Sequence, residues 1–281
     1  MPKSSRGGRR GSGGGSATTP QAPAFQDFQE AFQPGKDYQA VNGVNHVNRT
    51  VSRTTQQEWD QYANQMNNGV TSQDEQNIMR QWTPTPNAKG AYVTGYVRTQ
   101  NSFAINEAFY DPNNQGKSLT KMFKRKADRD TVKSLDKAIE NNQTQNDGNY
   151  IRFCGDNSIQ STFGLTNQQM TAIKNAPNMT SSELAALNQS LIGSKSYNPA
   201  YTSTSANRSL NAFSDPNAKQ SKGYYFERHI NTPKGTKAYA PRQNAQESET
   251  IFGRNLTTSL QGISISSDGH IVIHEKFEGY R

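Results

Sequence analysis

The sequence predicts an α+β protein in which helices come first and an antiparallel-rich sheet follows. Helical spacing of apolar residues dominates the first two thirds of the chain, and short β-prone runs between turns dominate from about residue 197. The chain also closes on ISISSDGHIVIHEKF, whose alternating isoleucines flank Asp268-Gly269, a strong two-residue hairpin signal. Helices and strands that are segregated along the chain are typical of the α+β class.

Composition excludes several classes of protein. The chain has 281 residues, 31% of them apolar, so part of it is expected to be solvated rather than packed. It contains no apolar run of the ~20 residues that cross a bilayer and no secretory signal, which predicts a protein made in the cytoplasm and without membrane contact. The single Cys154 excludes an internal disulfide and, by itself, a zinc site. The net charge of +8 favours nucleic acid or an acidic protein as a partner.

The chain divides at about residue 22. Residues 1–22 hold Gly, Ser, Arg and Pro with almost nothing to bury, which predicts a disordered basic arm. The basic side chains at 3–10 could contact nucleic acid, but a solubilising tail is the favoured interpretation because no aromatic residue is interleaved for stacking. Residues 23–281 are expected to form one domain, with a lead-in at 23–54 that includes a short helix before Pro34, and a core at 55–281.

Four further helices are expected in the core. The first two begin with capping-box spacing at Thr55 and at Ser72, and the second carries Trp82 on its apolar side and ends before Pro84. The other two are expected around residues 132–139 and 184–191, the last one closed by Gly193. Strands are expected at 150–153, 197–204, 223–230, 237–240 and 249–252, followed by the closing hairpin.

Three polar groups of residues fall on these strands, where an unused polar side chain is costly. Arg152 lies inside the otherwise apolar run YIRFC, where a guanidinium pairs with a carboxylate or a phosphate, and a structural ion pair is the plainer interpretation. The run YTSTS places Ser203 and Ser205 on one face of a strand and Thr204 on the other, which is also common at an ordinary strand edge.

The third group is the carboxylate pair Glu247 and Glu249. Two residues apart on an extended segment, these carboxylates share a face, which suits a division of roles between charge stabilisation and proton transfer. In isolation, a solvated acidic turn is the favoured interpretation of the pair. The order of the three groups along the chain favours a functional interpretation instead.

Arginine, Ser-Thr-Ser and Glu-x-Glu, in this order on successive strands, resemble the R-S-E class of mono-ADP-ribosyltransferases. This class includes clostridial binary-toxin enzymatic components, Rho-modifying exoenzymes and vertebrate arginine-modifying ecto-enzymes. The resemblance extends over residues 55–281 and includes further segments in family order: EWDQY, TSQDEQNIMRQWT, AYVTGYVRTQNSFAINEAF, SLDKAI, NYIRFCG, SLNAF and GTKAYAPRQNAQESETIFGRN. It implies the ADP-ribosyltransferase fold, with N-terminal helices followed by two packed, antiparallel-rich mixed β-sheets.

The resemblance also implies a function and a set of roles. The function is cleavage of NAD, with transfer of ADP-ribose to an arginine of a host target protein, NAD hydrolysis as a side reaction and no metal. Glu249 would hold the ribose, Ser203 would orient Glu249, and Glu247 would position or deprotonate the acceptor arginine. Residues implied in binding NAD are Arg152 on the pyrophosphate, Phe213 and Gly155 at nicotinamide, and Thr204, Ser205 and Tyr92.

The resemblance further implies a toxin-like effector. We expect a monomer that acts in the cytoplasm of a target cell and is delivered by a phage particle or a secretion apparatus, because the sequence shows no leader or translocation module. Two alternatives stay open at this point. One is a basic nucleic-acid- or virion-associated binding protein with the same fold and little turnover, and the other is transfer to an acceptor that is not arginine.

Other candidates carry less weight. His270 and His274 share a strand face but have no third ligand nearby, so a metal site is not expected. The basic run 121–129 could bind phosphate, but a solvated helix face is the favoured interpretation. Cys154 has no nearby base in the sequence and is expected to be a small buried residue rather than a nucleophile.

Overall fold

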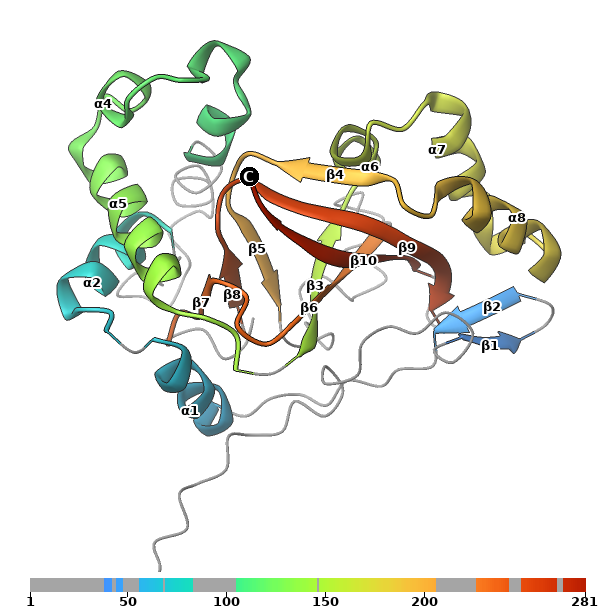
Figure 1. Cartoon of the computed structure of the whole chain (residues 1–281), viewed down its shortest axis with the longest axis horizontal. Coiled ribbons are helices and arrows are strands. Elements are labelled where there is room, and N and C mark those ends of the chain that lie inside the picture. The colour runs from blue at the N-terminus through green and yellow to red at the C-terminus, as the bar shows by residue number, and fades with distance from the viewer. Residues whose placement is uncertain are drawn as a thin grey trace, which may run out of the picture.

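A mixed β-sheet lies between two groups of helices (Figure 1). The computed structural model describes residues 38–41, 44–47, 56–67, 69–82, 105–145, 147–205, 226–242, 249–266 and 270–281. The predicted basic arm at 1–22 and the lead-in helix before Pro34 lie outside these residues. The helices are α1 (Gln56–Met66), α2 (Ser72–Gln81), α4 (Leu119–Met122), α5 (Lys126–Asn141), α6 (Asp156–Phe163), α7 (Asn167–Lys174) and α8 (Ser181–Leu191), with two 3₁₀ turns, η2 (Pro112–Asn114) and η3 (Ala176–Asn178).

The strands follow one hydrogen-bonded order, β1-β2-β9-β10-β6-β3-β5-β8-β7, and β4 pairs with β9 beside this path. Most neighbours are antiparallel, while β10 and β6, and β2 and β9, run parallel. The strands are β1 (Tyr38–Val41), β2 (Val44–Val47), β3 (Gly148–Cys154), β4 (Lys195–Asn198), β5 (Thr202–Ser205), β6 (Phe226–Thr232), β7 (Ala238–Tyr239), β8 (Glu249–Phe252), β9 (Leu256–Ser266) and β10 (Ile271–Tyr280).

The pairing between two neighbouring strands of the sheet is very short at one point. β3 pairs with β6 along seven residues but with β5 through one residue pair, Ile151 and Ser205. The predicted α+β class is confirmed, but the strands expected in two sheets form one continuous path across this link. The link places β5 and β8 beside β3, which is what brings the three predicted polar groups toward one another.

The two helix groups cover different parts of the sheet, as Figure 1 shows. Helices α2 and α5 pack on β7 and β8 through a cluster that includes Trp82, Leu135, Tyr201 and Ile251. Helices α6 to α8 pack on β9 and β10 through isoleucines of the closing hairpin and helix residues such as Leu184. Each of these helices therefore buries an apolar face against the sheet, which supplies most of the stability of short helices.

The elements differ from the prediction at several places. The second helix is capped by Thr71, whose hydroxyl accepts from the Asp74 N–H at 3.1 Å, one residue before the expected Ser72. The strand expected at 197–204 is divided into β4 and β5, because Pro199 lacks an N–H and the two parts pair with different strands. Neither β1 and β2 nor the helices α6 and α7 were predicted, although Thr166 and Gln169 form a capping box at the start of α7.

None of the helices within the described ranges has the length and hydropathy that crossing a bilayer requires.

Candidate active site

Glu249 stands where three distant segments of the chain meet. It begins β8 opposite Ser205 of β5, and only 6% of it is exposed. Its Oε1 accepts a hydrogen bond from Ser203 Oγ at 2.5 Å and another from the indole Nε1 of Trp82 at 3.1 Å. A carboxylate oxygen that accepts two such bonds is held in one orientation.

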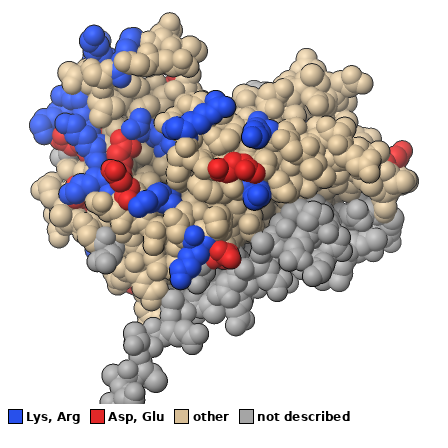
Figure 2. Space-filling model, in the orientation of Figure 1, with Lys and Arg blue, Asp and Glu red and all other residues tan. Residues whose placement is uncertain are grey.

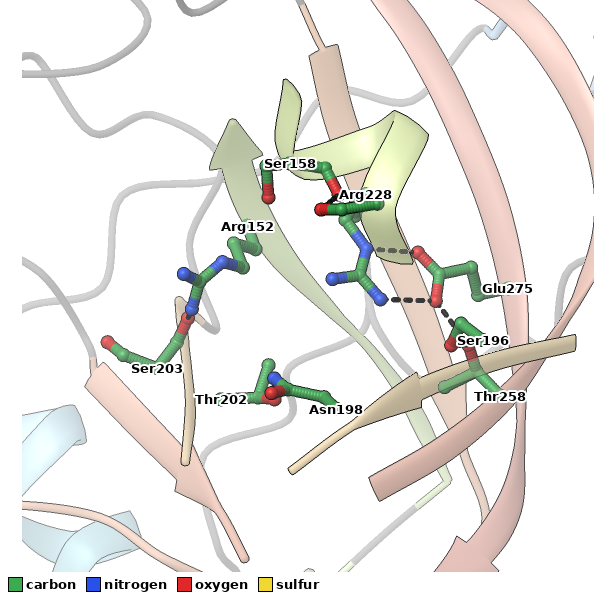
Figure 3. A network of polar contacts seen from close by, with 10 residues as sticks. Arg152, Ser158, Ser196, Asn198, Thr202, Ser203, Arg228, Thr258 and Glu275 are labelled. Carbon is green, nitrogen blue, oxygen red and sulfur yellow. Dashed lines mark hydrogen bonds and ion pairs between the residues drawn. The ribbon is translucent and has the colours of Figure 1, made fainter. Parts of the chain in front are cut away.

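Arg152 lies next to this carboxylate group on β3. Its Nη1 donates to the backbone carbonyl of Ser203 at 3.1 Å, as the close view in Figure 3 shows, and its side chain is only half-buried. Within the described part of the chain, Arg152 pairs with no carboxylate. The structural ion pair, which was the plainer interpretation of Arg152 taken alone, is therefore not observed there, and its guanidinium remains available to an anionic ligand.

The other described site residues do not all face this point. Thr204 lies on the opposite face of β5 from Ser203, and its hydroxyl donates to the Thr250 carbonyl at 2.7 Å. Ser205 is buried at the link between β3 and β5. Gly155 follows β3 as the N-cap of α6 with φ −94°, a conformation that does not by itself require glycine. The structure thus brings Arg152, Ser203 and Glu249 together and turns the Thr204 hydroxyl away from them.

Three predicted site residues, Glu247, Phe213 and Tyr92, lie outside the described residues. Their roles in acceptor activation and in nicotinamide or NAD contact remain predictions.

Trp82 is the site residue that the sequence did not reveal. Its spacing assigned it to the apolar side of the second helix, and it does pack there, with its ring 5.5 Å from that of Tyr201 in an edge-to-face arrangement. It is also the C-cap residue of α2, so its indole reaches past the helix end to Glu249. The available signal was that a buried indole N–H needs an acceptor.

Comparisons with known proteins identify the family of this chain. A family model described as ADP-ribosyltransferase exoenzyme matches residues 54–276. The chain belongs to this family. The resemblance drawn from the ordered motifs is thereby confirmed, and membership supports mono-ADP-ribosyltransferase activity with NAD as the donor. A comparison with curated proteins gives no match.

Solved structures of other ADP-ribosyltransferases share the fold. C3stau2 from S. aureus, solved with NAD, is 18% identical with a TM-score of 0.56, and the match covers 82% of this chain and 98% of that one. The Clostridium limosum C3 exoenzyme is 17% identical with a TM-score of 0.54, covering 80% and 96%. Plx2a, an ADP-ribosyltransferase toxin from Paenibacillus larvae, is 12% identical with a TM-score of 0.52, covering 81% and 98%.

The remaining candidates of the sequence have other surroundings in this exoenzyme-family fold. Burial raises the pKa of Cys154 to about 11, so its thiol is protonated at neutral pH and is not a nucleophile. His270 Nδ1 lies 3.2 Å from a Glu227 oxygen, and His274 Nε2 contacts the Ser264 hydroxyl at 2.8 Å. No group of three His, Cys, Asp or Glu suited to a metal ion occurs among the residues that the structure describes.

The basic run 121–129 lies on α4 and at the start of α5, where Figure 2 shows Lys and Arg gathered on one side of the molecule with acidic residues among them. Lys126 pairs with Asp130 at 2.7 Å, and Arg129 donates to the carbonyls of Phe123 and Lys124. These contacts fit a solvated helix face, the interpretation that the sequence favoured.

Proposed function

We propose that this protein cleaves NAD and transfers the ADP-ribose to an arginine side chain of a target protein, releasing nicotinamide. One observation carries the proposal. Ser203 and Trp82 both donate to Oε1 of a Glu249 carboxylate that is nearly buried, and Arg152 lies beside them with no carboxylate partner in the described part of the chain.

The residues present fit a dinucleotide substrate. NAD has an anionic pyrophosphate and a ribose whose bond to nicotinamide is broken in the reaction. Arg152 would bind the pyrophosphate through charge-assisted hydrogen bonds. Glu249 would lie at the ribose, where its fixed negative charge stabilises the positive charge that develops on the sugar as nicotinamide leaves. Ser203 would keep Glu249 in that orientation.

The acceptor depends on Glu247, two residues before Glu249. An arginine side chain is effectively always protonated in water, so it needs a carboxylate beside it to become nucleophilic. The Glu-x-Glu pattern supplies one in sequence, and by resemblance to the R-S-E class it accompanies arginine as the acceptor. When no acceptor is bound, water would take the place of the arginine, which gives the proposed NAD hydrolysis.

The experiment incubates the full chain with NAD labelled in its adenosine half, together with a host-cell lysate or with agmatine as a small guanidine acceptor. We expect label on protein and on agmatine, and roughly a hundredfold or greater loss with Glu249→Ala, because the lost charge acts on the transition state. The matched control is Glu140→Ala, which removes an exposed carboxylate of α5 and should leave transfer unchanged. Equal labelling by wild type and Glu249→Ala would overturn the proposal.

A second variant tests the acceptor. Glu247→Gln should abolish transfer to agmatine and retain most NAD hydrolysis, since it removes the base near the acceptor and leaves Glu249 in place. Mass spectrometry of the labelled protein identifies the modified side chain. An adduct on a residue other than arginine, or on nucleic acid, would contradict the arginine assignment while leaving NAD cleavage intact.

A further inference from the structure

A second arginine, Arg228 of β6, is buried close to the site. Arg228 is 2% exposed, and its Nε and Nη2 donate to the two carboxylate oxygens of Glu275 on β10 at 2.5 and 2.7 Å. The Thr258 hydroxyl also donates to Glu275, and Ser196 lies 2.5 Å from Thr258. The Thr258 hydroxyl thus holds the Glu275 carboxylate in place. The two bonds from Arg228 to that carboxylate fix the guanidinium in one orientation.

Arg228 is the strand partner of Arg152. The two residues are opposite each other where β3 and β6 run antiparallel, so their side chains leave the same face of the sheet from backbones about 5 Å apart. Figure 3 shows that two nitrogens of Arg228 point to Glu275 and that the third, Nη1, is turned to the side on which Arg152 lies. In the part of the chain that the structure describes, Arg152 has no acidic partner and Arg228 has no acidic partner other than Glu275.

The charge of Arg228 is set by its burial and by Glu275. Burial acts to lower the pKa of Arg228, but the Glu275 carboxylate outweighs it and keeps the guanidinium charged. Cys154 lies within the field of both arginines and is neutral, because burial raises its pKa to about 11. Glu275 binds two of the three guanidinium nitrogens of Arg228, while the Glu249 carboxylate beside Arg152 is held by Ser203 and Trp82. An anion between the two arginines would therefore meet Nη1 of Arg228, which binds no carboxylate in the described part of the chain.

We propose that Arg228 is a second arginine of the NAD site, which donates from Nη1 to the same pyrophosphate that Arg152 binds while Glu275 holds its other two nitrogens. This inference rests on the proposed function, because it needs a dinucleotide at Arg152. A pyrophosphate has oxygens on two phosphate groups, so guanidinium groups from adjacent strands can each donate to it. Glu275 has the role of a positioning residue, since it touches Arg228 and not the substrate.

The test uses the double variant Arg228→Met/Glu275→Leu in the full chain. Replacing both members of a buried ion pair by apolar residues of similar volume commonly preserves folding, whereas removing one leaves an unpaired buried charge. Binding of NAD, of ADP-ribose and of phosphate-free nicotinamide is measured by calorimetry. We expect the double variant to bind NAD and ADP-ribose about tenfold more weakly, with nicotinamide affinity unchanged, since only the charge-assisted bond to phosphate is lost.

Two further variants make the result specific. Arg228→Lys keeps a positive charge without the fork and should fall between the wild type and the double variant. Lys126→Met/Asp130→Leu removes an exposed ion pair on α5 and should bind all three ligands as the wild type does. If the double variant bound NAD like the wild type, or lost nicotinamide equally, the role of Arg228 would be disproved while the proposed function stood. A wild type that binds no NAD would instead reject the proposed function itself.

Discussion

The indole N–H of Trp82 donates a hydrogen bond to Oε1 of Glu249, at 3.1 Å between residues 167 positions apart in the chain. The end of α2 is thus tied directly to the carboxylate at the start of β8. Ser203 donates to the same oxygen, so donors from α2 and from β5 fix one carboxylate from two sides. In the proposed reaction this carboxylate acts on charge that appears only in the transition state, so its orientation matters more for turnover than for substrate binding.

Trp82→Phe should lower kcat roughly tenfold and leave the KM for NAD nearly unchanged. Phenylalanine keeps an aromatic ring against Tyr201 but lacks the N–H, and one hydrogen bond to a charged group is worth about 1.5–3 kcal/mol. Steady-state NAD hydrolysis gives both constants. As a control, Ile78→Val trims a buried side chain on the same helix without touching Glu249, and should change stability more than kcat. A rise in KM with kcat intact would mean that Trp82 serves NAD binding instead.

The buried pair Tyr62 and Tyr150 predicts sensitivity to alkali. Their hydroxyls are 2.5 Å apart, and burial raises the pKa of Tyr150 to about 12 and that of Tyr62 well above its ordinary value. The folded state therefore keeps protons that the unfolded chain releases near pH 10, so the free energy of unfolding should fall as pH rises above about 10. The expected slope is about 1.4 kcal/mol per pH unit for each phenol.

Urea unfolding between pH 9 and 12 measures this slope. In the variant Tyr62→Phe/Tyr150→Phe, the free energy of unfolding should fall less steeply with pH, because two of the phenols with raised pKa values are gone. Tyr201, Tyr239 and Tyr280 also have raised pKa values, so part of the slope should remain. An identical slope in the wild type and the variant would show that the Tyr62–Tyr150 pair does not contribute.

The Arg228–Glu275 pair should respond differently to single and double substitution. Glu275→Ala leaves a buried guanidinium unpaired and should lower the free energy of unfolding by about 3–5 kcal/mol. The double variant Arg228→Met/Glu275→Leu should stay within about 2 kcal/mol of the wild type, because no uncompensated charge remains. Denaturant unfolding of the three proteins compares these values. Equal losses in the single and double variants would mean that packing, not charge compensation, governs this part of the core.

Cys154→Ala should retain transfer activity. The thiol is protonated at neutral pH because burial raises its pKa to about 11, so it supplies neither a nucleophile nor a metal ligand. The change should cost about 1 kcal/mol of stability through the lost packing. In the wild type, thiol reagents should modify Cys154 only after unfolding. Loss of transfer in a stably folded Cys154→Ala protein would contradict this reading.

Much of the fold was accessible from local sequence patterns. Apolar periodicity located α1, α2, α5 and α8 and the closing hairpin, because each buries one face against the sheet. The short helices α6 and α7 were not predicted, because eight residues with many polar side chains give little apolar periodicity. Strand pairing was also not predictable, since a single residue pair, Ile151 and Ser205, joins two parts of the sheet.

The amino-acid sequence was sufficient to predict the α+β class and, through the order of its R, S and E groups, the family that the match to residues 54–276 confirms. Helical and strand periods, and the short motifs themselves, depend on residues that are close in the sequence. The order of those motifs can be read directly along the chain. The three-dimensional packing was needed to show which donors reach Glu249, that Arg152 has no carboxylate partner in the described chain, and that Arg228 lies opposite Arg152. These contacts join side chains from separate elements, and the packing of those elements, rather than any local preference, sets the distances between them.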